Sequence, residues 1–211
     1  MGFYNDVILP RLCDFAMRNK RLVPYRERVI SAAEGQVIEI GIGSGLNLPF
    51  YRPVVKEILA IEPAPKLVTM ARRAPRPEIR IKFIEASAEA IPIEGHSVDT
   101  VVTTWTLCTI PQAATALAEM RRVLRPGGRL LFVEHGLAPD ASVRRWQDRL
   151  NPVWRRISGG CNLNRPIQAM IESAGFQNRS RRDRLYARTK ANGHVVPGIV
   201  ERSMTAAFLA G

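Results

Sequence analysis

An apolar strand runs directly into a glycine-rich turn at residues 37–47, where the sequence reads VIEIGIGSGLN. Glycines occupy positions 41, 43 and 45. Glycine adopts backbone conformations that other residues avoid, and without a Cβ it lets a ligand approach the main chain closely. At the carboxyl end of the first strand of a parallel sheet, such a turn is typical of a nucleotide-type site. The turn therefore predicts both a fold class and the place of a ligand.

Short apolar strands alternate with helices along most of the chain. Strands are expected at residues 37–42, 57–62, 79–84, 98–103 and 129–134, with helices at 48–56, 65–73 and 113–124. This alternation indicates a parallel sheet covered by helices on both faces. Further helices are expected at 143–157, which Pro152 should interrupt, and at 165–174. A closing pair of strands is expected near 183–189 and 203–209.

The N-terminal segment has a different pattern from the rest. Residues 3–33 show helical spacing of apolar side chains with basic residues between them. We therefore expect a helical cap at residues 1–34 and one α/β domain at residues 35–211. A basic amphipathic segment of this kind could lie on a membrane or cap a substrate pocket. Simple coverage of the sheet edge is the favoured interpretation.

The chain is strongly basic, with a formal net charge of +12. This excess of positive charge could bind nucleic acid, an anionic membrane surface or an acidic substrate, or it could reflect an arginine-rich proteome. No apolar run is long enough for a spanning helix, and the N-terminus lacks the pattern of a secretion signal. The three cysteines form no CxxC pair, so neither a disulfide framework nor a zinc site is implied. We expect reduced cysteines in a cytoplasmic protein.

Two acidic residues stand close to the glycine turn. Glu62 ends the second strand, 21 residues after Gly41, which suits a carboxylate that accepts hydrogen bonds from a ribose diol. Glu39 lies inside the first apolar strand, where an unpaired charge would be costly to bury. A bound ammonium group or the N–H groups of the glycine turn could be its partner.

Five motifs now stand in a characteristic order. They are EIGIGSG at 39–45, IEP at 61–63, ASAEAIP at 86–92, SVD at 97–99 and RVLRPGGRLL at 122–131. In this order they resemble the class I S-adenosylmethionine-dependent methyltransferases. The resemblance implies a Rossmann-like α/β fold: a seven-stranded, mostly parallel sheet of order 3-2-1-4-5-7-6, with strand seven antiparallel and helices on both faces.

The same resemblance implies a cofactor site for S-adenosylmethionine. Gly41, Gly43 and Gly45 would pass under its methionine part, and Glu62 would hold the ribose hydroxyls. The remaining candidate cofactor residues are Ser87 and Ala88 at the adenine edge, Glu89 beside them, Thr104 at the methionine end, and Glu39 and Asn47 next to the glycine turn.

A narrower resemblance covers later segments. WTLCTI at 105–110, FVEH at 132–135 and GGCNLNR at 159–165 look like the methyltransferase-like proteins that S-methylate small alkyl thiols. Their bacterial relatives are often described as ubiquinone or phospholipid methyltransferases. The resemblance implies a small-molecule acceptor, with a thiol first and a lipid or quinone acceptor as the alternative.

Other chemistries have less support. An Asn/Asp-Pro-Pro-Tyr run after the fourth strand would suit nitrogen methylation, but Thr104 and Trp105 begin that position here. No His, Cys and Asp cluster has metal-ligand spacing, so we expect no metal site. The glycine spacing is GxGxG rather than GxGxxG, which disfavours a nucleotide-binding oxidoreductase. RNA binding through the basic residues 179–184 is ranked only as an accessory property.

The acceptor side of the site offers one catalytic candidate. His135 follows the fifth strand and could act on the proton of a thiol acceptor or orient it, since the thiolate is the reactive form. A histidine that only packs and hydrogen-bonds locally is the alternative. Cys108 and Cys161 would border the acceptor without a catalytic role. Trp146 and Trp154 could cover the acceptor, but core packing is favoured for both.

Overall fold

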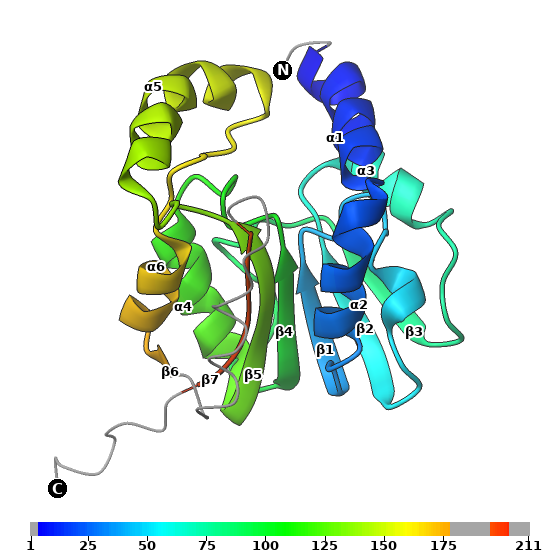
Figure 1. Cartoon of the computed structure of the whole chain (residues 1–211). Helices are drawn as coiled ribbons and strands as arrows, with labels where there is room; N and C mark the ends of the chain where they lie inside the picture. Colours follow the sequence, from blue (N-terminus) through cyan, green and yellow to red (C-terminus); the bar gives the residue numbers. More distant parts are fainter. Residues whose placement is uncertain (1–3, 178–194, 203–211) are drawn as a thin grey trace, which may run out of the picture.

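A seven-stranded sheet forms the centre of the protein in the computed structural model, which describes residues 4–177 and 195–202 (Figure 1). The strand order is β3-β2-β1-β4-β5-β7-β6, as the resemblance implied. The strands are β1 (Gly35–Ile40), β2 (Val55–Ile61), β3 (Arg80–Ile84), β4 (Val98–Thr104), β5 (Leu124–His135), β6 (Phe176–Gln177) and β7 (Val195–Arg202). β7 pairs antiparallel with β5 and β6, while the other neighbours are parallel.

Side chains alternate between two apolar cores along the central strands. Val37 of β1 packs in one core with Val29 and Ile30 of α2 (Val23–Ile30). Ile38 and Ile40 of the same strand belong to the other core, which includes α4 (Ala113–Val123) and α6 (Ile167–Ser173). The sheet is therefore buried on both sides, which explains its near-continuous apolar strands.

Two further helices stand above one edge of the sheet in Figure 1, namely α1 (Leu9–Met17) and α5 (Ala141–Ile157). The hydroxyl of Tyr4, in the turn before α1, donates to the carbonyl of Ile157 at 2.5 Å. This contact joins the start of the chain to the end of α5. Among the described residues no helix is both long and apolar enough to cross a membrane.

Several expected boundaries need correction. The helix expected at 48–56 is only the short 3-10 turn Leu48–Phe50, because Pro49 and Pro53 limit helical hydrogen bonding and β2 already begins at Val55. Pro152 does not interrupt α5, which continues to Ile157. The described closing strands lie at 176–177 and 195–202. The strands expected at 183–189 and 203–209, and the basic segment 179–184, fall outside the described residues.

Candidate functional site

The glycine turn sits where β1 ends, between β2 and β4. Gly41 has φ +69°, and a Cβ built on it would lie 2.5 Å from the side chain of Thr106. Gly43 has φ +56° and open space at its Cβ position, whose nearest neighbour is a backbone oxygen 3.9 Å away. Gly41 therefore allows the segment after β4 to approach the turn, while Gly43 leaves bare main chain facing outward.

Glu62 is fixed against this bare main chain. One of its carboxylate oxygens accepts a hydrogen bond from the N–H of Gly43 at 3.0 Å, and the other accepts from Ala64 at 3.1 Å. The residue is only 6% exposed, and this burial raises the pKa of its carboxyl above the ordinary value. A carboxylate has about four acceptor positions, so two backbone contacts leave capacity for hydroxyl donors.

Glu39 finds its partners in side chains. Its oxygens accept from Asn47 Nδ2 at 2.6 Å and from the Tyr51 hydroxyl at 2.8 Å. The expectation that the N–H groups of the glycine turn could satisfy it was therefore wrong, since those of Gly41, Gly43 and Gly45 donate to other acceptors. Asn47 Nδ2 also donates to the Thr104 hydroxyl, at 2.9 Å. Three predicted cofactor residues thus form one buried network behind the turn, and complete burial raises the pKa of Glu39 to about 7.

The N-terminal helices close this network from above. Arg26 of α2 donates to Asn47 Oδ1 at 2.6 Å, and its guanidinium carbon lies 4.7 Å from the ring centroid of Trp105. Burial lowers the pKa of Arg26 to about 10, although the charge of Glu39 opposes this. From α1, Asp14 accepts from Arg18 through Oδ2 at 2.8 Å. Its Oδ1 is buried and lacks a hydrogen-bond partner among the described residues.

The expected adenine edge follows β3. Ala88 is buried, whereas Ser87 is exposed. Glu89 accepts the N–H of Gln112 at 2.6 Å and lies 3.3 Å from the Ser87 hydroxyl. Glu89 therefore holds the turn before α4. Of the other two candidates, only Ser87 is exposed at this edge, while Ala88 packs in the core.

Sequence analysis did not single out Glu134 as a site residue. This buried acid of β5 accepts from Thr103 Oγ1 at 3.1 Å and from the N–H groups of Thr106 and Leu107 at 2.9 and 3.0 Å. The turn that it holds contains Trp105 at φ +52°, a conformation uncommon outside glycine. Burial raises the pKa of Glu134 to about 7. An acid among the apolar residues of β5 was the available signal.

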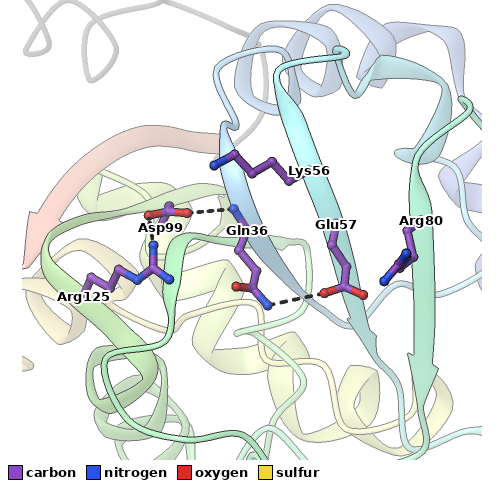
Figure 2. Close-up of a pocket in the computed structure, with 6 residues that line it drawn as sticks. All are labelled: Gln36, Lys56, Glu57, Arg80, Asp99 and Arg125. Atoms are coloured by element: carbon purple, nitrogen blue, oxygen red, sulfur yellow. Dashed lines mark hydrogen bonds and ion pairs between the residues drawn. The ribbon is translucent and has the colours of Figure 1, made fainter.

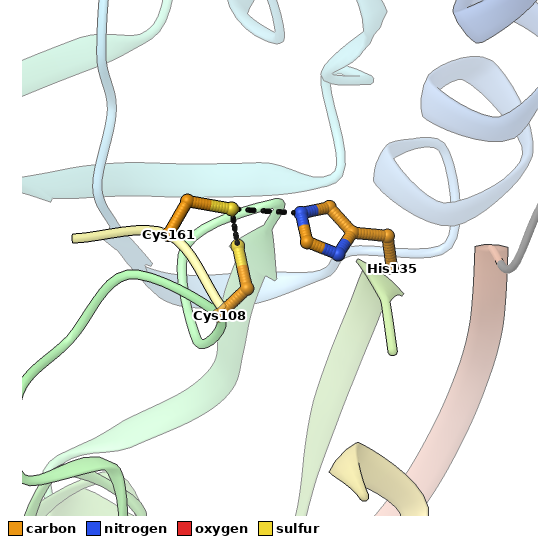
Figure 3. Close-up of side chains that lie close together, drawn as sticks. All are labelled: Cys108, His135 and Cys161. Carbon is orange, nitrogen blue, oxygen red and sulfur yellow. Dashed lines mark hydrogen bonds between the residues drawn. The ribbon is translucent and has the colours of Figure 1, made fainter. Parts of the chain in front are cut away.

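Three further residues come together beside this turn, although they are far apart in sequence. Cys108, His135 and Cys161 place one ligand atom each within 4.8 Å of one another (Figure 3). His135 Nε2 lies 2.9 Å from Cys161 Sγ, which is 3.5 Å from Cys108 Sγ. Spacing in the sequence gave no sign of such a cluster, and the expectation of no metal site rested on that spacing alone.

The surroundings shift the protonation of this cluster. Contact with the Cys108 sulfur lowers the pKa of Cys161 to about 4, helped by His135 and opposed by burial. Burial opposes protonation of His135, but the Cys161 sulfur and the nearby Glu134 outweigh it and raise the histidine pKa. The pKa of the Cys108 thiol is raised well above its ordinary value by its contact with Cys161 and by burial. These shifts favour deprotonation of Cys161 and protonation of His135.

A pocket with mostly charged lining residues lies at the opposite end of the sheet. Its lining residues start or precede the strands: Gln36, Lys56, Glu57, Arg80, Asp99 and Arg125 (Figure 2). Asp99 pairs with Arg125 at 2.7 Å and accepts the N–H of Gln36 at 2.8 Å. Ligands of parallel sheets bind outside the carboxyl ends of the strands. This charged hollow is therefore not the candidate cofactor site.

The outer surface of α5 corrects another prediction. Trp146 and Trp154 are 61% and 41% exposed, so core packing was the wrong expectation for both. The buried residue of this helix is Gln147, which bonds the carbonyls of Gly136 and Leu163 at 2.9 and 2.8 Å. The helix is thus attached by a polar side chain and leaves an apolar surface free, formed by Trp146, Leu150, Val153, Trp154 and Ile157.

Comparison with known families agrees with this geometry. Residues 38–132 match the family described as methyltransferase domain. The chain has the fold of a class I methyltransferase domain. Its matched part includes β1 with the glycine turn, β2 with Glu62, and β4, and it ends within β5.

Similar curated proteins act on more than one kind of acceptor. The chain is 36% identical over 148 residues to the thiol S-methyltransferase TMT1B of Rattus norvegicus, covering 68% of this chain and 60% of the relative. It is 35% identical over 154 residues to TMT1B of Homo sapiens, covering 70% and 63%. The chain thus spans under two thirds of these relatives. More distant matches include a ubiquinone/menaquinone biosynthesis C-methyltransferase and a phosphatidylethanolamine N-methyltransferase.

Solved structures agree on the fold. An S-adenosylmethionine-dependent methyltransferase from Mesorhizobium loti superposes with a TM-score of 0.63 at 15% identity, covering 88% of this chain and all of that one. The YcgJ protein of Bacillus subtilis gives a TM-score of 0.60 at 23% identity, covering 75% and 68%. At these identities the likeness concerns the fold of the methyltransferase domain alone.

Proposed function

We propose that this protein transfers the methyl group of S-adenosylmethionine to a small-molecule thiol. The observation that carries the proposal is the Glu62 carboxylate, fixed by the N–H of Gly43 at the tips of β1 and β2. The similarity to thiol S-methyltransferases over about two thirds of the chain supports the choice of acceptor.

The residues of the site suit this cofactor. Gly43 offers bare main chain to the methionine part, Gly41 lets the Thr106 segment approach the turn, and Glu62 keeps acceptor capacity for the ribose hydroxyls. S-adenosylmethionine also carries a sulfonium and an ammonium group. The buried, unpartnered Oδ1 of Asp14, in the helix beside the network, is an acceptor for such a cation. When bound, the cofactor supplies an electrophilic methyl group, and the protein contributes chiefly alignment, which is worth about 7–11 kcal/mol.

Within this proposal some of the other candidates border the cofactor and others hold the turn beneath it. Gly45 follows the outward-facing main chain, and Ser87, Ala88 and Glu89 border the adenine. Glu39, Asn47 and Thr104 act by holding the turn, since their polar atoms already bond one another. His135 belongs to the acceptor side. Because its Nε2 is engaged with Cys161, we assign it an orienting role shared with that thiol.

A methyl-transfer screen tests the choice of acceptor. Purified protein would be incubated with methyl-labelled S-adenosylmethionine and, in separate reactions, small alkyl thiols, quinols, phosphatidylethanolamine vesicles and RNA. Transfer to thiols is the expected result. Transfer only to quinols or to the lipid would favour the alternative acceptors that distant relatives suggest, and transfer only to RNA would overturn the small-molecule assignment.

We further propose a cytoplasmic protein that contacts an anionic membrane at its surface through α5. The apolar surface of α5 is flanked on the same helix by Arg144, Arg145, Arg149, Arg155 and Arg156, against a single acid, Asp148. Apolar insertion with arginines facing lipid phosphates is typical of interfacial helices. A lipophilic acceptor could then enter from the lipid beside the site.

Vesicle sedimentation checks this contact. Trp146→Asp with Val153→Asp should reduce binding to vesicles containing anionic phosphatidylglycerol by about tenfold or more, given the apolar area removed. Val54→Asp is a matched control, because Val54 is also apolar and 57% exposed but precedes β2. Equal loss in the control, or binding that neither variant reduces, would contradict the proposed contact.

A further inference from the structure

The Cys108, His135 and Cys161 cluster has the composition of a metal site. Two sulfurs and one imidazole nitrogen face a common point, and they come from the segment after β4, the end of β5 and the loop after α5 (Figure 3). Thiolate and imidazole together are ligands that suit zinc. Three protein ligands with an open fourth position are the usual arrangement of a catalytic zinc site.

The separations are close to those that zinc requires. Bonds of about 2.3 Å to sulfur and about 2.0–2.1 Å to nitrogen place tetrahedral sulfurs roughly 3.8 Å apart, and sulfur and nitrogen roughly 3.6 Å apart. The two sulfurs here are 3.5 Å apart, and His135 Nε2 is 2.9 Å from Cys161 Sγ. Admitting the ion would widen the sulfur–sulfur separation by about 0.3 Å, from 3.5 to roughly 3.8 Å, and the nitrogen–sulfur separation by about 0.7 Å, from 2.9 to roughly 3.6 Å. Rotation of the histidine side chain would supply the larger change.

The backbone around the ligands is already fixed. The carbonyl of Cys108 accepts from both the N–H and the Nδ2 of Asn162, each at 2.9 Å. Arg165 braces the same segment by donating to the carbonyls of Leu107 and Ile110, the latter at 2.6 Å. These bonds tie the loop that carries Cys161 to the segment that carries Cys108. The site is therefore built into the fold, with its ligand atoms held together before any ion binds.

The cluster also adjoins the candidate cofactor site. Thr106, two residues before Cys108, packs against Gly41 of the glycine turn. Glu134 holds the N–H groups of the intervening turn and directly precedes His135 in β5. A group bound at the cluster would thus lie on the same edge of the sheet as the cofactor.

We propose that Cys108, His135 and Cys161 bind one zinc ion whose fourth position takes the acceptor thiol. The acceptor role rests on the proposed thiol methyltransferase function, whereas zinc binding does not. Coordination deprotonates a thiol outright, and the thiolate is the reactive nucleophile. The thiol proton leaves to solvent. The acceptor sulfur then forms a bond to the methyl carbon as the carbon–sulfur bond of the sulfonium breaks, which yields a neutral thioether and S-adenosylhomocysteine.

Metal content tests the zinc site without reference to activity. Reduced protein would be loaded with zinc and dialysed, and its zinc content per chain would be measured by elemental mass spectrometry. In a parallel experiment, cobalt loading would be followed by the sulfur-to-cobalt charge-transfer absorbance. One zinc per chain is expected, together with a cobalt–thiolate band. Cys161→Ser should abolish both, with His135→Gln as the second variant if the first fails to fold by circular dichroism.

Cys13→Ser is the matched control, since Cys13 is an exposed cysteine on α1 outside the cluster. It should keep both the zinc and the cobalt band. Zinc binding that is absent from the reduced protein, or that survives in both cluster variants, would overturn the site. A disulfide between Cys108 and Cys161 that persists in reducing buffer and prevents zinc loading would also overturn the site.

The acceptor role needs a second readout. Adding a small alkyl thiol to the cobalt-loaded protein should change the cobalt spectrum, and Cys161→Ser should still bind S-adenosylhomocysteine. A spectrum that no thiol alters would overturn the open fourth position. If zinc binds but S-adenosylhomocysteine does not, the proposed function fails and the metal site stands. If the cofactor binds and thiols are methylated without zinc, the acceptor role of the metal fails and the proposed function stands.

Discussion

Removing the Glu134 carboxylate should be one of the most destabilising single changes in this protein. Its Oε1 accepts three hydrogen bonds of 2.9–3.1 Å, from the Thr103 hydroxyl and the N–H groups of Thr106 and Leu107. Its Oε2 accepts one longer bond of 3.4 Å from Cys108. Glu134 is fully buried, so little water is available to replace these bonds.

Because the two Glu134 oxygens accept different numbers of hydrogen bonds, substitution by alanine and by glutamine should lower the free energy of unfolding by different amounts. Each buried donor left unpaired costs about 1–3 kcal/mol, so Glu134→Ala should lower the free energy of unfolding by about 3–9 kcal/mol. That is a large part of the roughly 5–15 kcal/mol that stabilises an ordinary domain. Glu134→Gln can keep its carbonyl oxygen toward the three short bonds and lose only the long one, at a cost of about 1–3 kcal/mol.

Urea unfolding, followed by tryptophan fluorescence and circular dichroism, measures both values. Glu85→Ala is the control, because Glu85 is an exposed acid and its loss should change stability by less than about 0.5 kcal/mol. Equal costs for the alanine and glutamine variants, or costs below about 1 kcal/mol for both, would refute the idea that Glu134 holds this turn.

Two further predictions concern the glycine turn and its network. Burial raises the pKa of Glu39 from 4.5 to about 7, so between these values the folded protein keeps a proton that the unfolded chain has lost. Stability should therefore fall as pH rises through that window, and Glu39 should account for about 3 kcal/mol of the fall, since buried Glu134 titrates over the same range. The pH-dependent loss of stability in Glu39→Gln should be smaller than in the wild type by that amount. Gly41→Ala should lower stability by more than Gly127→Ala, because both have positive φ but only Gly41 would place its Cβ against Thr106, at 2.5 Å. Melting temperatures that fall equally in the two glycine variants would contradict the packing argument.

The sheet and the glycine turn at the end of its first strand were predictable from the sequence. The apolar pattern of a strand and the glycine pattern of a turn depend on residues close together in the sequence. The motifs around Gly41 and Glu62 therefore indicated the turn directly. The resemblance added the strand order, including the antiparallel β7, which local pattern alone could not supply.

What the sequence did not reveal depends on contacts between distant segments. Cys108 and Cys161 are separated by 53 positions and meet only because the loop after α5 folds back onto the segment after β4. Trp146 has helical apolar spacing, which does not say whether that face of α5 meets the core or the solvent. The partners of Glu39 were also unpredictable, since Asn47 and Tyr51 reach it only after the 3-10 turn at 48–50 forms.

Titration calorimetry with S-adenosylhomocysteine tests the central claim most directly. The wild-type protein should bind, and Glu62→Ala should bind about 10- to 100-fold more weakly, as expected for the loss of hydrogen bonds to a charged acceptor. The melting curve of the variant shows whether it remains folded. Binding with unchanged affinity in a folded Glu62→Ala protein, or no heat from the wild type, would contradict a cofactor site at the tips of β1 and β2.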